Sequence, residues 1–357
     1  MRNLKTGAAA LLALTVASAG VMATVGAVAA QEDDEIVVGV SWANFQEPRW
    51  ALWDKTAIQA TLDAAGATYI EADAQTSSEK QVSDIENLIA QGADALIIIA
   101  WEGKALGPAI DAALAEGIPV VGYDRLIEDE RVFYTSFDNV EVGRMQARGV
   151  QEAQPTGNYV FIKGSPTDAN ADFLYGGQLE VLQEAIDAGD IVNVANVYTD
   201  DWLDTNAQAN MEQILTEQND EVDAVVASND GTARGVMAAL AGRGLLGTVP
   251  VSGQDGDFPN LNAVALGNQT VDVWKDARAL GEASTLAALE LIENGGDLAA
   301  VTGAAPFETP EGNTVSSLLL EPIPITQDNL DLVLDAGWID EETLCQNVEP
   351  GSVAVCP

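Results

Sequence analysis

The sequence contains no histidine among its 357 residues, and this absence excludes several kinds of chemistry. Ser-His-Asp triads and Cys-His pairs need an imidazole as the base, and many zinc sites need one as a ligand. The glycines of residues 242–247 follow a predicted helix rather than a strand, so they are not a dinucleotide fingerprint. We therefore expect a protein that is not an enzyme of these classes and that carries no metal or cofactor.

Cysteine is almost absent, since the chain has only Cys345 and Cys356, both near the C-terminus. In an oxidising compartment we expect these two to form a disulfide that closes a short loop, worth up to about 3 kcal/mol. The alternatives are two free thiols or a partial metal site, and the latter lacks supporting ligands. The sequence therefore favours the disulfide.

Basic residues are scarce, with 15 Lys and Arg against 56 Asp and Glu, which gives a formal net charge of −41. A surface this acidic repels nucleic acid and anionic lipid, so we expect neither as a partner. Solubility alone could explain the charge. We favour the interpretation that the protein is adapted to high salt, in which dense carboxylates are screened.

Long apolar runs are absent except at the N-terminus, where residues 8–30 carry no charge. A basic start precedes this run, small residues at 27–30 end it, and an acidic stretch follows at 31–35. This pattern predicts a cleavable signal peptide over residues 1–30 and an extracytoplasmic protein, periplasmic or otherwise secreted. An uncleaved membrane anchor is the alternative, and a lipid anchor is not expected because no cysteine follows the run.

The 327 residues that remain after cleavage (357 − 30) suggest two domains and read as alternating strands and helices. This alternation predicts an α/β fold of parallel sheets flanked by helices. The expected strands are 36–40, 67–71, 95–100, 120–121, 158–163, 192–198, 224–227, 249–252 and 317–322. The expected helices are 50–65, 78–91, 106–116, 142–152, 171–188, 205–217, 232–242 and 274–293.

Polar residues follow three of the buried-strand runs, in the stretches 123–125, 228–230 and 252–255. At the carboxyl ends of parallel strands such groups project into the crevice where ligands bind. Guanidinium, carboxylate and carboxamide groups make paired hydrogen bonds that suit neighbouring hydroxyls. With a tryptophan nearby, this combination predicts a site for a sugar.

Seven short motifs together resemble the periplasmic sugar-binding proteins of ABC importers with the type I fold. Within that family they are most similar to the D-xylose-binding members and then to the multiple-sugar receptors. The resemblance extends from residue 36 to about residue 344. The motifs are residues 48–50, 81–87, 123–127, 136–139, 164–168, 223–230 and 252–255.

The resemblance implies two similar lobes, joined by a three-crossing hinge, that close around a ligand in the cleft. It places residues 36–139 and 256–307 in the N-terminal lobe. Residues 140–255 and 308–344 form the C-terminal lobe, with 345–357 as a tail. It also implies a monomer that captures a monosaccharide, D-xylose first, and delivers it to the membrane permease of an ABC transporter.

Nine residues resemble family ligand contacts because their local motifs match. Asp172, Phe173 and Gly256 depart from the pattern, which leaves the size of the pocket open. The nine residues are Arg49, Asp124, Arg125, Asp168, Asn170, Trp202, Asn229, Asp255 and Lys275.

Other interpretations remain open at this point. Asp124 and Arg125 could be a structural ion pair, and Trp42 and Trp101 could pack in the core or line the cleft. The sugar could be arabinose, ribose, glucose or galactose, and the receptor could also serve chemotaxis or signalling. A regulator of similar fold would need a basic helix-turn-helix in place of the signal peptide. A glycosidase is least expected, because basic neighbours should keep Asp124 and Asp255 ionised and leave no general acid.

Overall fold

The structure is a computed structural model that describes residues 35–357, which form one compact unit. The predicted signal peptide, residues 1–30, lies outside the described residues. Within residues 35–357, no helix has both the length and the apolar character needed to cross a membrane.

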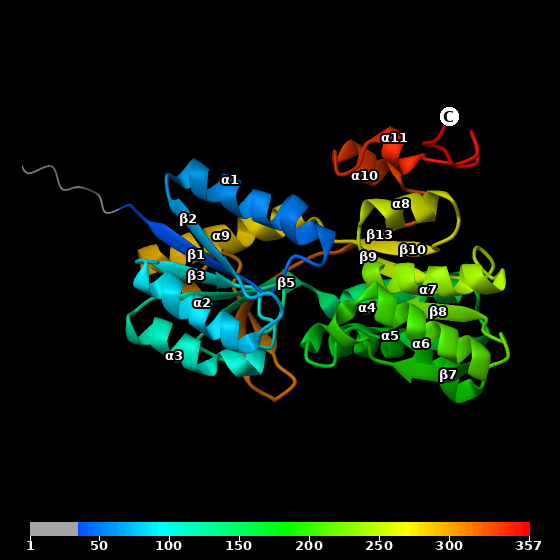
Figure 1. The fold of residues 1–357 in the computed structure, drawn as a ribbon, viewed down its shortest axis with the longest axis horizontal. Helices are drawn as coiled ribbons and strands as arrows, with labels where there is room; N and C mark the ends of the chain where they lie inside the picture. Colours follow the sequence, from blue (N-terminus) through cyan, green and yellow to red (C-terminus); the bar gives the residue numbers. More distant parts are fainter. Residues whose placement is uncertain (1–34) are drawn as a thin grey trace, which may run out of the picture. The chain divides into compact units, whose positions relative to one another are not determined.

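A seven-stranded sheet is built from the first five strands and two late ones (Figure 1). The strand order is β11-β12-β5-β4-β3-β1-β2, and all neighbours are parallel except β11 and β12. Sheets of this kind are buried on both faces, which explains the continuous apolar runs in the sequence. The strands are β1 (Val37–Trp42), β2 (Thr68–Asp73), β3 (Ala95–Ile98), β4 (Val120–Tyr123), β5 (Phe133–Phe137), β11 (Ala305–Glu308) and β12 (Thr314–Leu320).

Helices cover both faces of this sheet and bury a separate hydrophobic core on each. The pair α1 and α9 packs on one face, and the pair α2 and α3 packs on the other (Figure 1). A π-helical turn, Trp50–Asp54, precedes the first of these helices. Their bounds are α1 (Lys55–Ala65), α2 (Ser78–Ala90), α3 (Gly107–Ala115) and α9 (Ala277–Asn294).

A second group of strands forms two small sheets, with the orders β7-β6-β8 and β13-β10-β9. A parallel bridge between Val225 and Val251 connects them. The strands are β6 (Gly157–Ile162), β7 (Ile191–Val197), β8 (Ala224–Ala227), β9 (Ser252–Asp255), β10 (Val271–Trp274) and β13 (Ile323–Ile325). The helices around them are α4 (Asn139–Ala153), α5 (Ala169–Ala188), α6 (Asp204–Glu217), α7 (Asp230–Arg243) and α8 (Phe258–Ala265).

The predicted α/β fold with parallel sheets and flanking helices is confirmed, but the lobe boundaries and the start of one helix differ from the prediction. Residues 256–307 were assigned to the first lobe, yet β10 pairs with β9 and β13 of the second group. Residues 308–344 were assigned to the second lobe, yet β12 pairs with β5 of the seven-stranded sheet. The helix expected from residue 274 starts at Ala277, because Trp274 ends β10. Sequence patterns do not reveal which sheet a strand joins, since its partners lie far away in the chain.

The chain therefore passes between the two groups of strands three times, at residues 138, 275–276 and 321–322. After the last passage come the short helices α10 (Asp331–Asp335) and α11 (Glu341–Leu344). The predicted disulfide between Cys345 and Cys356 is present in this C-terminal segment. There Trp338 stacks on Trp53, with ring centroids 4.6 Å apart, so the segment packs against the π-helical turn that precedes α1.

Candidate functional site

All nine predicted site residues line a single cavity, with an empty volume of about 310 Å³. The residues come from the carboxyl ends of strands in both groups, as expected for an α/β fold. Three further residues line the cavity that the prediction did not include: Glu47, Trp50 and Gln254.

The backbone at three of these positions adopts the left-handed conformation that favours glycine. The φ angles are 60° at Asp124, 58° at Trp202 and 107° at Asp255. At Asp124 a tight turn is closed by the N–H of Arg125, which donates to the carbonyl of Tyr123 at 2.6 Å. Strained backbone of this kind clusters at functional sites, where the surrounding structure holds it in place.

Arg49 is the central cation of the cavity and is almost completely buried. Its Nη1 lies 3.1 Å from Asp124 Oδ2 and 3.2 Å from Asp255 Oδ1. Asp124 follows β4 of the seven-stranded sheet, whereas Asp255 ends β9 of the second group. One guanidinium nitrogen therefore joins carboxylates from the two groups of strands.

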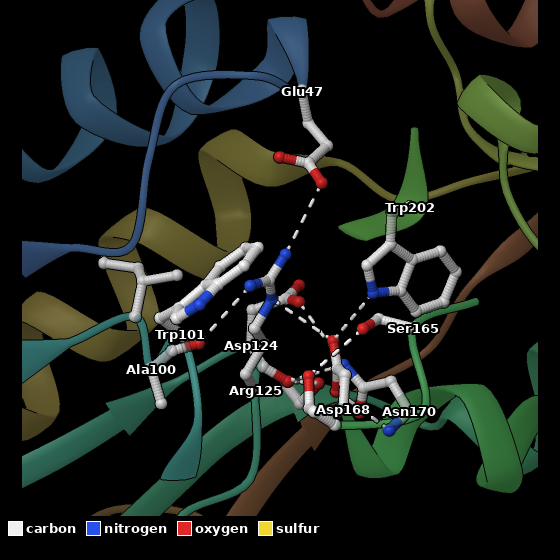
Figure 2. Close-up of polar contacts among 12 residues, drawn as sticks. Glu47, Ala100, Trp101, Asp124, Arg125, Ser165, Asp168, Asn170 and Trp202 are labelled. Atoms are coloured by element: carbon white, nitrogen blue, oxygen red, sulfur yellow. Dashed lines mark hydrogen bonds and ion pairs between the residues drawn. The ribbon is translucent and has the colours of Figure 1, made fainter. Parts of the chain in front are cut away.

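Arg125 makes a second connection of the same kind (Figure 2). Its Nε lies 3.2 Å from Asp168 Oδ2, and its Nη2 lies 3.4 Å from Glu47 Oε1. The guanidinium carbon also lies 5.8 Å from the ring centroid of Trp101. Trp101 thus packs beside the cavity, whereas Trp42 is fully buried in the core of the seven-stranded sheet.

Asp168 caps the N-terminus of α5, where Oδ1 accepts a hydrogen bond from the N–H of Asn170 at 3.0 Å. The other carboxylate oxygen, Oδ2, accepts a hydrogen bond from Trp202 Nε1 at 3.2 Å (Figure 2). Asp168 therefore fixes the edge of the indole as well as the start of a helix. Gly164 makes room for the ring, because a Cβ at this position would lie 2.0 Å from it.

A chain of amides connects the remaining polar residues. Lys275 Nζ donates to Asn139 Oδ1 at 2.9 Å, and Asn139 Nδ2 donates to Asn170 Oδ1 at 3.0 Å. Asn170 Nδ2 in turn donates to the backbone carbonyl of Asp124 at 3.1 Å. Asn229 caps α7 by accepting from the N–H of Thr232 at 2.9 Å, which leaves its Nδ2 free to donate.

Two acceptors on the cavity have no hydrogen-bond donor within the described part of the chain. They are Gln254 Oε1 and Asp124 Oδ2, the latter facing Arg49 only as an ion pair. A buried acceptor without a donor costs about 1–3 kcal/mol, so a ligand that brings O–H groups is favoured here.

The charges of the cavity affect its two central carboxylates differently. Burial raises the pKa of Asp124, but attraction to Arg49, Lys275 and Arg125 outweighs it and lowers the pKa below its ordinary value. For Asp255 burial prevails over attraction to Arg49 and Lys275 and raises the pKa to about 6. The expectation that basic neighbours keep both groups ionised therefore applies to Asp255 only above about pH 6. Burial also lowers the pKa of Lys275.

The chain is similar to known proteins over most of its length. The D-xylose-binding periplasmic protein of Escherichia coli is 37% identical over 320 residues, which are 87% of this chain and 93% of that protein. The multiple sugar-binding periplasmic receptor ChvE of Rhizobium radiobacter is 31% identical, over 85% of this chain and 90% of that protein.

A solved structure also matches. It is an ABC transporter solute-binding protein from Clostridium phytofermentans with bound β-D-glucose, with a TM-score of 0.77 and 32% identity. The match covers 86% of this chain and 99% of that chain. These relatives are binding proteins and receptors, which agrees with the prediction that the chain is not an enzyme.

The model of the periplasmic binding protein domain matches residues 38–297, which include every residue of the cavity described above. This match and the relatives at 31–37% identity confirm the resemblance inferred from the seven motifs. The chain belongs to the periplasmic binding protein family.

Proposed function

We propose that the protein captures one monosaccharide outside the cytoplasm and delivers it unchanged to the membrane permease of an ABC transporter. The observation that carries this proposal is Gln254 Oε1, a buried acceptor without a donor among the described residues, on a cavity that the carboxylates of Asp124 and Asp255 also line. A sugar hydroxyl would satisfy this acceptor, and the carboxylates can accept from others. The indole of Trp202 at the same cavity offers the apolar surface that the C–H face of a sugar ring requires.

The nine predicted residues form the ligand shell in this proposal, with Glu47, Trp50 and Gln254 added from the structure. Arg49 and Arg125 donate in pairs, Asp124, Asp168 and Asp255 accept, and the amide and ammonium groups complete the shell. The alternative role of Asp124 and Arg125 as a structural ion pair loses support, since the pairs that form are Arg49–Asp124 and Arg125–Asp168.

The first candidate for the sugar is D-xylose, the ligand in the name of the E. coli relative. D-glucose is the second, because it occupies the related solute-binding protein of known structure. The two sugars differ by one hydroxymethyl group, so the free volume of the cavity decides between them.

Binding is proposed to close two lobes around the sugar, with boundaries that follow the strand pairing. The first lobe comprises residues 36–137 and 277–320, and the second comprises 139–275 and 323–344. The ion pairs Arg49–Asp255 and Arg125–Asp168 connect the two sets. The same proposal includes export by a cleavable signal peptide, without a lipid anchor, and a monomeric receptor.

Calorimetric titration of residues 31–357 with D-xylose, D-glucose, arabinose, ribose and galactose tests the proposal. We expect one site per chain, filled by xylose or glucose, and chromatography should recover the sugar unchanged. Absence of heat with all five sugars would show that the ligand is not a common monosaccharide. Recovery of a product in place of the sugar would show that the protein is an enzyme.

A further inference from the structure

Two buried acids, Asp230 and Asp272, lie directly behind the cavity without lining it. Asp230 is the first residue of α7 and follows Asn229, and Asp272 is in β10, three residues before Lys275. Both acids have an exposed fraction of 0%. Carboxyl groups at this depth are normally paired with a cation or with several donors, so each partner has to be accounted for.

The missing side chain of Gly253 brings the two carboxyl groups together. Gly253 in β9 lies opposite Asp272 in β10. A Cβ on Gly253 would lie 2.4 Å from Asp230 Oδ1, so any other residue would displace the Asp230 carboxyl group from this position. With glycine there, the Asp230 carboxyl group lies over β9 next to Asp272, close enough for the two carboxyl groups to interact.

Few hydrogen-bond donors lie near the carboxyl oxygens of Asp230 and Asp272. Asp230 Oδ2 accepts a hydrogen bond from the N–H of Asp257 at 2.7 Å, and Oδ1 has only Gln269 Nε2 at 3.5 Å. Among residues 35–357, neither oxygen of Asp272 has a donor in hydrogen-bonding geometry. The N–H of Gly256 approaches Asp272 without reaching that geometry.

The basic side chains near the two acids donate their hydrogen bonds to other groups. Arg234, one turn further along α7, donates to Asp257 Oδ2 at 2.6 Å and to Asn260 Oδ1 at 2.9 Å. Lys275 donates to Asn139. Helix α4, which packs on β9, places the neutral Gln146 against the carbonyl of Gly253 at 3.2 Å. Two ionised carboxylates that are buried side by side, with no basic side chain between them, would repel each other strongly.

We propose that Asp230 and Asp272 share one proton, and that this proton-bridged pair positions Asn229 and Lys275 at the back of the sugar pocket. The bridge joins the first turn of α7 to β10, the two elements from which these pocket residues project. The shared proton rests on the burial and placement of the two carboxyl groups and on the scarcity of donors around them, not on the sugar. The positioning role rests on the proposed function.

Burial and the neighbouring acids also favour a protonated pair. Burial and repulsion from Asp272, Asp257 and Asp255 raise the pKa of Asp230 well above its ordinary value. Burial and repulsion from Asp257 and Asp255 do the same for the pKa of Asp272. A raised pKa in the folded state means that the neutral form stabilises the fold. This contribution is complete below the ordinary pKa of about 3.9 and is lost as pH rises through the folded pKa.

Infrared spectroscopy of residues 31–357 tests for the shared proton without any ligand. At about pH 7 the spectrum should contain the carbonyl band of protonated carboxyl groups, and Asp272→Asn should remove the share of one group. The control Asp328→Asn, at an exposed turn, should leave the band intact. If Asp272→Asn does not fold, Asp230→Asn is the second variant, because it replaces the other acid that shares the proton. A band that is absent in the wild type, or unchanged in a folded variant, overturns the proposal.

The pH dependence of unfolding gives a second measurement. Asparagine at position 272 imitates the neutral acid and has no proton to lose. Between the ordinary pKa of about 3.9 and the raised pKa of the folded pair, the unfolding equilibrium constant of the wild type relative to Asp272→Asn should therefore rise about tenfold per pH unit, and above that pKa the ratio should level off. The ratio for Asp328→Asn should stay flat over the same range. A flat ratio for Asp272→Asn as well would contradict the shared proton.

Sugar titration over the same pH range tests the positioning role. Relative to Asp272→Asn, in which Asp255 is unchanged, the affinity of the wild type should fall as pH rises through the pKa of the pair, since ionisation forces the pair apart. Identical pH profiles would show that the pair does not position the pocket. If the wild type binds no sugar at all, the proposed function is wrong, while the infrared and unfolding measurements still decide on the shared proton.

Discussion

Asp54 fixes the orientation of the Arg49 guanidinium group, because its two carboxylate oxygens accept hydrogen bonds from Arg49 Nε at 3.1 Å and from Arg49 Nη2 at 2.7 Å. The hydroxyl of Tyr123 donates to the same carboxylate. Only Nη1 of Arg49 is left to face Asp124 and Asp255. Asp54 itself does not line the cavity, yet it decides which nitrogen of the arginine does.

Replacing Asp54 with Ala should lower the free energy of unfolding by about 3–5 kcal/mol, because it leaves a buried guanidinium without its main partner. The measurement is denaturation by guanidinium chloride, whose ionic strength also screens the acidic surface. The matched control is Asp84→Ala, which removes an ion pair with the exposed Lys80. An exposed i,i+4 pair contributes below about 1 kcal/mol, so equal losses in both variants would show that Asp54 is not the anchor of Arg49.

Replacing Asp124, Arg125 or Asp255 with Ala should weaken sugar binding by about 2 kcal/mol or more in each case. Each deletion leaves a desolvated hydroxyl or an unpaired buried charge, and this costs more than the net value of a hydrogen bond. Calorimetric titration measures the loss, with circular dichroism as the check on folding. Glu341→Ala and Glu342→Ala, in the exposed first turn of α11, should bind as the parent does. Folded pocket variants with unchanged affinity would place the sugar elsewhere.

Part of the pocket could be predicted because strand ends leave a local pattern in the sequence, and the other residues were inferred from the resemblance of short motifs to the family. The runs before Asp124, Asn229 and Asp255 are apolar and continuous, as a strand buried on both faces requires. The polar residues that follow such runs lie at the carboxyl edge of a sheet, whichever strands are neighbours. Glu47 and Gln254 lie next to or within the motifs that were recognised, and a wider margin around each motif would have included them.

The parts that could not be predicted depend on contacts between distant segments. Asp54 reads as an ordinary polar position in a helix, and only its burial against Tyr123 reveals its role. Trp274 was taken for the start of a helix because its strand is only four residues long. The assignment of β10 and β12 to their sheets depends on partners more than ten residues away, and no local periodicity encodes them.

Gly164 is predicted to be indispensable for the position of the indole of Trp202. In Gly164→Ala the new Cβ would lie 2.0 Å from the ring, so the tryptophan must move and lose its hydrogen bond to Asp168. Sugar affinity should fall by about tenfold or more, close to the effect of Trp202→Ala, and the sugar-induced change in fluorescence should decrease. The control is Gly176→Ala in α5, where a Cβ meets no atom within 4 Å. This variant should bind normally and be slightly more stable, since alanine favours a helix.

Asp255 should make both stability and sugar binding depend on pH around 6. Its pKa is raised by burial to about 6 in the folded protein, against about 3.9 in an unfolded chain. The stabilising effect of the neutral form is therefore complete below about pH 4 and disappears as pH rises to about 6. Asp255→Asn, which is always neutral, should unfold like the wild type at low pH and be more stable at neutral pH, by up to about 3 kcal/mol.

Asp255 should give sugar binding the opposite pH dependence from that of stability. A hydroxyl that donates to Asp255 prefers the ionised carboxylate, so the wild-type affinity should rise as pH increases through about 6. Binding near that pH should also release a proton, which calorimetry detects as a heat that varies with the ionisation enthalpy of the buffer. Asp328→Asn is the control for the acidic surface and should keep both effects. A wild-type affinity that stays constant between about pH 5 and pH 7, with no proton release, would mean that Asp255 does not accept a hydrogen bond from the sugar.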